Sequence, residues 1–417
     1  MSKHTLYLCY FGLREPLVQT QVIPYLREIL KDNIKVSLLT FEPNFKKSWT
    51  REQIAAQKQE LAAKGISWFC LPYHKRPSAP ATLYDTLHGA YFSWKLIRRE
   101  KVDVLHARVH IPALMGAIAG KLSSRKTKLI FDIRGFFPEE YTDAGNWKQN
   151  GFLYRTVKRV EKWLLKESDG FVVLTEKARD ILFPGSEETG FDKAGRPVEV
   201  IPCCVDFNER FKDNERKTRQ QTRQELNLDG RLVITHVGML GGLYLTDDIA
   251  DFLAAARGYN PKTFALFLTQ TDPNLIIPLL TERGFTNSDY FVEKVSPNDV
   301  PRFLNASDIA LSFVRASFAT LSRSPTKIPE YLACGLPIVS NKGVGDVDEL
   351  ILTERVGAVI DNFNQESYLE ALEKIQNLKS EEGFIERCQN AAKIRFDLVT
   401  VGGKKYRSLY KKLLSEK

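Results

Sequence analysis

The chain has 417 residues, 43% of them hydrophobic and 27% charged, and its formal net charge is +9. This is the composition of a globular protein with a core large enough that no structural metal or disulfide is required for stability. At roughly 100–200 residues per domain, the length predicts two domains. The positive charge favours anionic partners, namely phosphorylated ligands, nucleic acid or an anionic membrane face, and simple solubility explains it equally well.

The cysteines and the hydropathy of the chain indicate its compartment. None of the six cysteines forms a C-x-x-C pair, so we expect buried free thiols in a reducing environment. The N-terminal stretch lacks the apolar core of a signal peptide, and no run approaches the roughly 18–20 apolar residues that span a bilayer. We therefore expect a cytoplasmic protein, or one bound peripherally to the inner face of the plasma membrane.

The first half of the chain alternates short β-branched runs with helical patterns, which predicts a parallel sheet covered on both faces. Thr50 and Gln53 form a capping box for a helix that ends before Gly65, and residues 152–165 carry apolar side chains at helical spacing. The expected strands are 5–11, 35–41, 66–73, 102–107, 128–133, 170–175 and 198–203.

A highly charged segment, 208–226, separates the two halves. It lacks the interleaved aromatic residues that stack on nucleic-acid bases. We interpret it as a solvated linker followed by a surface helix, and we expect no nucleic-acid partner.

The second half repeats the alternation, so we predict an α/β protein of two doubly wound, Rossmann-like domains that face a central cleft. The N-terminal domain is expected at 1–205 and the C-terminal domain at 206–396. Residues 397–417 are expected to form an amphipathic helix that packs back onto the N-terminal domain. The expected strands are 231–238, 263–270, 290–295, 308–314, 336–341 and 356–361.

Residues 324–346 combine helix-start, charge and loop signals in one segment. Ser324 suits an N-cap and Pro325 the first helical position, but Pro329 would then cost a helical hydrogen bond. The helix therefore either begins later, capped by Thr326, or has an irregular first turn. In both cases backbone N–H groups at the helix start favour a phosphate.

Lys327 and Glu330 are three residues apart and share a face of this helix. Lys327 can neutralise a phosphate, and the Glu330 carboxylate can accept hydrogen bonds from a ribose diol. This pattern is typical of a nucleotide site, and an exposed salt bridge explains the spacing equally well. Asp346, in a D-x-D pattern, is interpreted as an N-cap rather than a metal ligand.

Several segments together resemble the family 4-type, group 1 glycosyltransferases of the GT-B fold. The most specific is PTKIPEYLACGLPIV, which is similar to the nucleotide-sugar signature of that family, PSK-x-x-EYMA-x-G-x-P-V. Segments resembling other family patterns occur in the same order as in the family, and they are VDVLHARVHIPAL (D-V-V-H-x-H), ESDGFVVLTEKARDIL, VIPCCVDFNERF and ITHVGML.

The resemblance implies retaining transfer of a sugar from a nucleotide diphosphate, UDP in our expectation, to a glycan or lipid-linked acceptor in polysaccharide assembly. It implies no metal and no cofactor besides the nucleotide-sugar co-substrate. The donor would bind the C-terminal domain, and the acceptor the N-terminal one. The donor residues expected from it are Gly238, Gly241, Gly242, Tyr244, Arg315, Ser324, Pro325, Thr326, Lys327 and Glu330.

The donor side departs from the family pattern at three places. Met239 stands where the family has an arginine, Leu243 or Tyr244 lies near the position of its lysine, and Ser322 replaces the first glutamate of its E-x7-E pattern. Backbone amides of Gly241 and Gly242, or the side chains of Arg315 and Arg323, are the expected compensation. Two alternatives stay open. One is a GT-B nucleotide-sugar epimerase, and the other, which these departures favour, is an inactive homologue that binds nucleotide or glycan as a scaffold.

The acceptor side is expected at the strand ends of the first half. Asp132 and Arg134, with Glu139 beyond them, follow the fifth strand, where a carboxylate could orient or deprotonate an acceptor hydroxyl. The alternative is an Asp132–Arg134 pair that only shapes the loop.

Further acceptor-side residues are expected at two other turns. His106 and His110 flank Arg108 at the end of another strand, and we assign His110 a catalytic role with Asp132 and Arg134. Gly12 is expected to close the first strand-to-helix turn. Basic and aromatic side chains that could face a membrane are Lys75, Arg76, Tyr91, Phe92 and Trp94.

Overall fold

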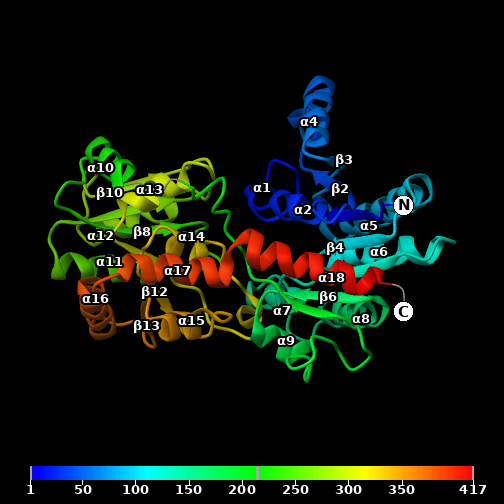
Figure 1. Cartoon of the computed structure of the whole chain (residues 1–417). Coiled ribbons are helices and arrows are strands. Elements are labelled where there is room, and N and C mark those ends of the chain that lie inside the picture. Colours follow the sequence, from blue (N-terminus) through cyan, green and yellow to red (C-terminus); the bar gives the residue numbers. More distant parts are fainter. Residues whose placement is uncertain (1, 213–215, 416–417) are drawn as a thin grey trace. The chain divides into compact units, whose positions relative to one another are not determined.

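The computed structural model describes residues 2–212 and 216–415. It divides into two compact units, which we call unit 1 (residues 1–202 with 402–417) and unit 2 (residues 203–401). Both units are built on an all-parallel sheet covered by helices (Figure 1). Across the described ranges, no helix is long and apolar enough to cross a membrane.

The unit 1 sheet has seven strands in the order β3-β2-β1-β4-β5-β6-β7, and all of them pair in parallel. Every strand expected in the first half of the chain is present. Because both faces of the sheet are covered, the strands other than the edge strand β3 are buried almost throughout, as their continuous apolar runs predict. The strands are β1 His4–Cys9, β2 Lys35–Glu42, β3 Ile66–Pro72, β4 Val104–Arg108, β5 Lys128–Asp132, β6 Gly170–Val173 and β7 Val198–Val200.

The helices of unit 1 connect these strands. The predicted capping box is confirmed at α4, where the Gln53 amide donates to Thr50 Oγ1 at 3.2 Å and the Thr50 amide donates to Gln53 Oε1 at 3.2 Å. The helices are α1 Pro16–Gln21, α2 Ile23–Leu30, α3 Phe45–Ser48, α4 Arg51–Ala63, α5 Ser78–Glu100, α6 His110–Leu122, α7 Phe137–Asp143, α8 Phe152–Glu167, α9 Glu176–Leu182 and α18 Lys404–Leu414.

The C-terminal helix α18 packs on unit 1, against α2 and β7. Its apolar stripe is buried, and the Tyr410 hydroxyl lies 2.8 Å from Thr5 Oγ1 and 2.9 Å from His106 Nδ1. Arg407 forms an ion pair with Glu28 of α2 at 2.6 Å. The Tyr410 side chain of α18 therefore takes part in a buried hydrogen-bond network with polar side chains of the unit 1 sheet.

The unit 2 sheet has six parallel strands in the order β10-β9-β8-β11-β12-β13. All six strands expected in the second half are present. The strands are β8 Leu232–Val237, β9 Thr263–Leu268, β10 Tyr290–Glu293, β11 Ile309–Ser312, β12 Ile338–Asn341 and β13 Gly357–Ile360.

The helices of unit 2 include α10 Arg216–Glu225 in the charged segment, where a surface helix is expected; residues 213–215 of that segment lie outside the described residues. Arg219 of α10 donates to the carbonyls of Asn305 and Ser307 and forms an ion pair with Asp308, so this polar helix is held by charge rather than by apolar burial. The other helices are α11 Thr246–Tyr259, α12 Ile277–Glu282, α13 Val300–Ala306, α14 Lys327–Ala333, α15 Val347–Glu354, α16 Gln365–Ser380 and α17 Phe384–Phe396.

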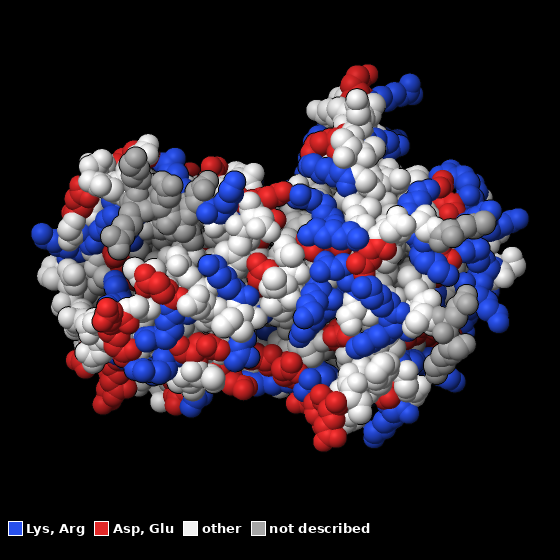
Figure 2. Space-filling model, viewed as in Figure 1, with Lys and Arg blue, Asp and Glu red and all other residues white. Residues whose placement is uncertain are grey.

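The two units differ in charge. Counted along the sequence, unit 1 has a larger positive charge than the +9 of the whole chain, so unit 2 is net acidic. Figure 2 shows Lys and Arg gathered on the visible face of unit 1, including the area over α18. The basic surface of unit 1 therefore favours an anionic partner on this unit.

Candidate active site

The segment between β11 and β12 contains the most specific of the predicted donor residues. α14 begins at Lys327, and Thr326 occupies the N-cap position without a capping side-chain hydrogen bond. Pro329 thus lies in the first turn, where its missing N–H breaks no helical hydrogen bond. Of the two helix starts that the sequence allows, the later one is correct. Ser324 Oγ is not a cap and accepts a hydrogen bond from the Cys203 amide at 3.1 Å.

Lys327 is buried, with 4% of the residue exposed. Its Nζ lies 3.4 Å from His236 Nε2 at the end of β8 and 4.5 Å from the centroid of the Tyr244 ring. Burial lowers the pKa of Lys327 to about 7 and holds the pKa of His236 well below its usual value. Within the described residues no carboxylate forms an ion pair with Lys327. The charge of Glu330 raises the pKa of Lys327 less than burial lowers it, and Glu330 is itself paired with Arg210.

The glycine loop after β8 approaches Lys327 directly. Gly238 has a φ of +114°, and a Cβ at this position would lie 3.4 Å from Lys327 Nζ. Only glycine fits such a backbone easily. The Gly241 amide donates to Thr246 Oγ1 at 2.8 Å, so without a ligand this amide is engaged within the loop, and its availability to a phosphate stays a prediction. Gly242, with a φ of +64°, has open space around its Cα.

Glu330 is paired in this structure. Arg210 Nη1 donates to Glu330 Oε1 at 2.9 Å, and Arg210 Nη2 donates to the Pro297 carbonyl at 2.8 Å. Arg210 is absent from the residues expected at the donor site, although it lies in the VIPCCVDFNERF segment. Tyr331 is also absent from them; its hydroxyl accepts from the Val237 amide at 2.8 Å and ties α14 to the end of β8.

Two positions that depart from the family pattern differ in their surroundings, since Met239 lies in this loop and Ser322 ends the 3-10 turn Ala319–Ser322. Met239 is 60% exposed, and Ser322 is buried with its hydroxyl donating to the Ala319 carbonyl at 2.7 Å. The Arg315 amide donates to the Leu243 carbonyl at 2.8 Å. This pairing joins the glycine loop to the chain that follows β11, and the Arg315 side chain is exposed there.

In unit 1, Asp132 is fully buried at the end of β5. Arg134 Nε lies 2.7 Å from its Oδ1, Arg134 Nη2 donates to Oδ2 at 2.9 Å, and the Tyr406 hydroxyl donates to Oδ2 at 3.0 Å. Burial alone would raise the pKa of Asp132, but Arg134 and His106 hold it well below its usual range. These contacts favour the structural interpretation of the Asp132–Arg134 pair over a role as base for an acceptor hydroxyl.

His110 and Glu139 are joined through α8. His110 Nε2 lies 2.8 Å from Glu161 Oε2, and Lys158 pairs with both Glu161 and Glu139, the latter at 3.0 Å. The His110 ring stacks on Phe137 with 5.2 Å between centroids. His110 is buried, and its imidazole is thus held between a carboxylate and an aromatic ring at the start of α6.

Gly12 follows β1, where a turn is expected. A Cβ at Gly12 would lie 2.8 Å from Pro43 Cδ and 3.1 Å from Glu42 Oε2. The next amide, that of Leu13, donates to Glu42 Oε1 at 2.9 Å. Close packing against the end of β2 therefore accounts for the glycine.

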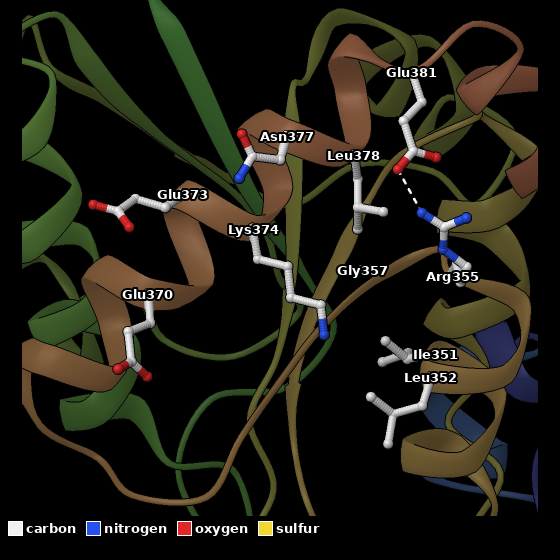
Figure 3. A pocket seen from close by; sticks show the side chains of 10 residues that line it. All are labelled: Ile351, Leu352, Arg355, Gly357, Glu370, Glu373, Lys374, Asn377, Leu378 and Glu381. Atoms are coloured by element: carbon white, nitrogen blue, oxygen red, sulfur yellow. Dashed lines mark hydrogen bonds and ion pairs between the residues drawn. The ribbon is translucent and has the colours of Figure 1, made fainter.

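A cavity of about 490 Å³ lies in unit 2, between α16 and the α15–β13 segment, and Figure 3 shows Lys374 extending into it beside the Arg355–Glu381 ion pair. None of its lining residues belongs to the predicted donor site. Asp346 occupies the N-cap position of α15. Among the residues that the structure describes, no group of three or more His, Cys, Asp or Glu side chains is placed to hold a metal ion.

Comparison with known proteins identifies the family. Residues 18–209 match the model of Glycosyltransferase Family 4, and residues 269–395 match the model of Glycosyl transferases group 1. The chain belongs to the family 4-type, group 1 glycosyltransferases. The first match lies mainly in unit 1 and the second lies in unit 2, so the family assignment covers both units.

Three proteins that this glycosyltransferase resembles are distant from it in sequence. It is 25% identical over 195 residues to spore coat protein SA of Bacillus subtilis (strain 168), a match that covers 44% of this chain and about half (50%) of that protein. A glycosyltransferase from Rickettsia africae ESF-5 superposes with a TM-score of 0.71 at 14% identity, with 100% of both chains covered. Anabaena Alr3699/HepE in complex with UDP superposes with a TM-score of 0.67 at 17% identity, with 99% of this chain and 100% of that chain covered. These structural likenesses show that the fold is GT-B.

Proposed function

We propose that this protein transfers a sugar, with retention of anomeric configuration, from a UDP-sugar to a glycan or lipid-linked acceptor in the assembly of a cell-surface polysaccharide. The observation that carries the proposal is the buried Lys327 ammonium beside Gly238, which has no carboxylate partner among the described residues. A diphosphate is the ligand that such a cation fits. The structures of Anabaena HepE, which contain UDP or UDP-glucose, support the choice of nucleotide.

Charge stabilisation is the main catalytic effect that we propose for Lys327. The bond from the anomeric carbon to the diphosphate oxygen breaks while the acceptor oxygen bonds to the same carbon. Because the leaving diphosphate gains charge, a preorganised cation there stabilises the transition state by several kcal/mol. Lys327 supplies this cation, so we propose that no metal takes part.

The acceptor hydroxyl must also lose its proton. Asp132 is committed to Arg134 and Tyr406 and is fully buried, so we propose that the leaving diphosphate takes the proton. Glu330, oriented by Arg210, would accept hydrogen bonds from the ribose hydroxyls.

A thermal-shift and calorimetric screen tests the donor site. UDP, GDP, ADP and their sugars are compared with the wild type, Lys327→Ala and Lys342→Ala. Lys342 is an exposed lysine of unit 2 paired with Asp361, and it serves as the control. A UDP-dependent rise in Tm that is lost only in Lys327→Ala is expected. If no nucleotide shifts the wild-type Tm, the proposal is wrong.

Two alternatives to a transferase are tested separately, and Met239 and Ser322 favour only the second of them. An epimerase would convert the nucleotide sugar without an acceptor, and an inactive homologue would bind the nucleotide without releasing sugar. Mass spectrometry of UDP-glucose incubated with and without acceptor separates both from a transferase, which is expected to release UDP in an acceptor-dependent way.

We also propose that unit 1 contacts an anionic membrane through α5. Four side chains at helical spacing, Leu83, Tyr84, Leu87 and Tyr91, are 51–58% exposed. Lys95 lies over the Tyr91 ring at 4.7 Å, and unit 1 is strongly basic. An exposed apolar stripe next to cations is typical of a helix that lies on a lipid surface.

Co-sedimentation with vesicles tests this contact. Binding to vesicles that contain phosphatidylglycerol, and not to phosphatidylcholine vesicles, is expected for the wild type. It should be lost in Leu83→Glu/Leu87→Glu and kept in a control, Leu352→Glu, which changes an exposed leucine of unit 2. Equal sedimentation of the stripe variant and the wild type would contradict the proposal.

A further inference from the structure

Arg108 is the last residue of β4, at the carboxyl edge of the unit 1 sheet, and only 2% of it is exposed. From β1 the chain builds β2 and β3 on one side and then crosses to β4 on the other side of β1. Arg108 therefore stands where the strand order reverses, opposite Cys9, the last residue of β1. In doubly wound sheets, ligands bind in the crevice at this point.

The guanidinium of Arg108 donates no hydrogen bond to any described residue, and its Nε and Nη1 atoms are buried. The nearest carboxylate oxygen, Asp132 Oδ2, lies 3.9 Å from Nη1. That oxygen already accepts hydrogen bonds from Arg134 at 2.9 Å and from Tyr406 at 3.0 Å. A buried donor without an acceptor destabilises a folded protein, so the donors of Arg108 lack a partner that a ligand can supply.

The charge around Arg108 is also unbalanced. Two guanidinium groups, of Arg108 and Arg134, face one carboxylate, that of Asp132. Burial lowers the pKa of His106 and raises the pKa of the tyrosine and cysteine side chains nearby, so all of these groups are neutral near pH 7. The tyrosines and the cysteine are Tyr7, Cys9, Tyr406 and Tyr410. One positive charge remains uncompensated at a buried position, which favours an anion.

The helix that follows adds to this field. α6 begins at His110, two residues after Arg108, and extends over 13 residues without a side-chain cap at its N-terminus. Its dipole favours negative charge at the same end of β4. Val109 between them has φ of 66° and ψ of 178°, a conformation that is strained for a β-branched residue and fixes the direction of the chain here.

We propose that Arg108 binds an anionic group, a phosphate or a carboxylate, carried by the acceptor at the β1–β4 edge of unit 1. The planar fork of a guanidinium matches both groups. The identification of the ligand as the acceptor rests on the proposed transferase function, whereas anion binding at Arg108 does not depend on it. The acceptor class is then a sugar phosphate, a phospholipid-linked glycan or a uronic acid, rather than a neutral glycan.

Inorganic phosphate is the first probe, at constant ionic strength set with chloride. The measurement uses Lys327→Met as the background, so that the donor site of unit 2 does not contribute. Phosphate is expected to raise the Tm of this variant and not that of Lys327→Met/Arg108→Gln. Equal shifts in the two, or no shift in either, would overturn the proposal, and neither result depends on nucleotide binding or transfer.

A matched pair of variants separates a ligand site from a structural ion pair. Without phosphate, Arg108→Gln should leave the Tm unchanged or raise it, because it removes an unpartnered charge. Arg134→Gln should lower the Tm, because it leaves Asp132 without its bidentate partner. A drop for Arg108→Gln as large as that for Arg134→Gln would show that Arg108 is structural and would overturn the proposal.

Transfer assays distinguish an acceptor from free phosphate as the source of the anion. Transfer from UDP-glucose to neutral and to phosphorylated or uronic sugars is compared in the wild type and Arg108→Gln. A tenfold or larger loss of kcat/KM confined to the anionic acceptors would support the assignment. A phosphate-induced Tm shift together with equal losses for all acceptors would overturn the assignment to the acceptor and leave a free-anion site.

Discussion

The carboxyl edges of the two sheets hold buried charge in opposite ways. In unit 1, Asp132 is surrounded by Arg134 and Tyr406, which belong to the same unit. In unit 2, the Lys327 ammonium faces a neutral imidazole, that of His236, and the aromatic ring of Tyr244. Both residues lie at a strand end or helix start where ligands of α/β sheets bind. Burial and position alone therefore do not identify a functional charge; the absence of an internal counter-charge does.

The largest effect is expected at Asp132. Asp132→Asn would leave the Arg134 guanidinium buried without its partner, which costs about 3–5 kcal/mol of unfolding free energy. Calorimetric unfolding measures the loss, with Asp169→Asn, a partly exposed partner of Lys128, as the control. If Asp132→Asn left the stability unchanged and abolished sugar transfer, Asp132 would be a functional and not a structural charge, and its catalytic role would be supported.

Whereas Asp132→Asn should lower the free energy of unfolding, Lys327→Met should raise it. Its pKa of about 7 is below the unfolded value of 10.5, so the unfolded state binds the extra proton between these values and stability rises with pH across that window. Removing the charge should stabilise the unliganded protein at pH 7 by roughly 2–4 kcal/mol and abolish the rise in Tm with UDP. A destabilised Lys327→Met variant would mean that the ammonium has an internal partner.

The affinity for the donor should depend on the protonation of Lys327. Above pH 7 the free site loses its proton, so binding of UDP-glucose should weaken by up to about tenfold per pH unit. Calorimetry at pH 6.5, 7.5 and 8.5 measures this, with Lys327→Met as the variant that should show no such slope. An affinity that is constant over this range would indicate that Lys327 stays charged without ligand.

The smallest effect is expected at Tyr244. The centroid of its ring lies 4.5 Å from Lys327 Nζ. Tyr244→Leu removes the cation–π attraction between this ring and the Lys327 ammonium, about 0.5–1 kcal/mol. Binding of UDP-glucose should weaken about two- to fivefold, while Tyr259→Leu on α11 should leave it unchanged. A loss as large as that in Lys327→Met would show that Tyr244 contacts the nucleotide itself.

Much of the architecture could be predicted from the sequence, because parallel strands buried on both faces are continuous apolar runs. In the part of the chain that the structure describes, the thirteen strands all fall in expected runs, although the edge strands β3 and β10 are only partly buried, and the Thr50 capping box forms as its spacing predicts. The donor segment was also recognisable, since Lys327 and its glycine loop lie in local motifs. The partners of the donor-site residues could not be recognised from the sequence. Arg210, for example, pairs with Glu330, which lies 120 positions away along the chain.

The sequence by itself determined the alternation of strands and helices, the family and the residue types at each strand end, since these depend on neighbours along the chain. Only the tertiary structure decided which charges are satisfied. Tyr406 reaches Asp132 across 274 positions, and His236 faces Lys327 across 91. A counter-charge acts through space, so whether Asp132 is structural, and whether Lys327 and Arg108 await an anion, depends on contacts that no local pattern encodes.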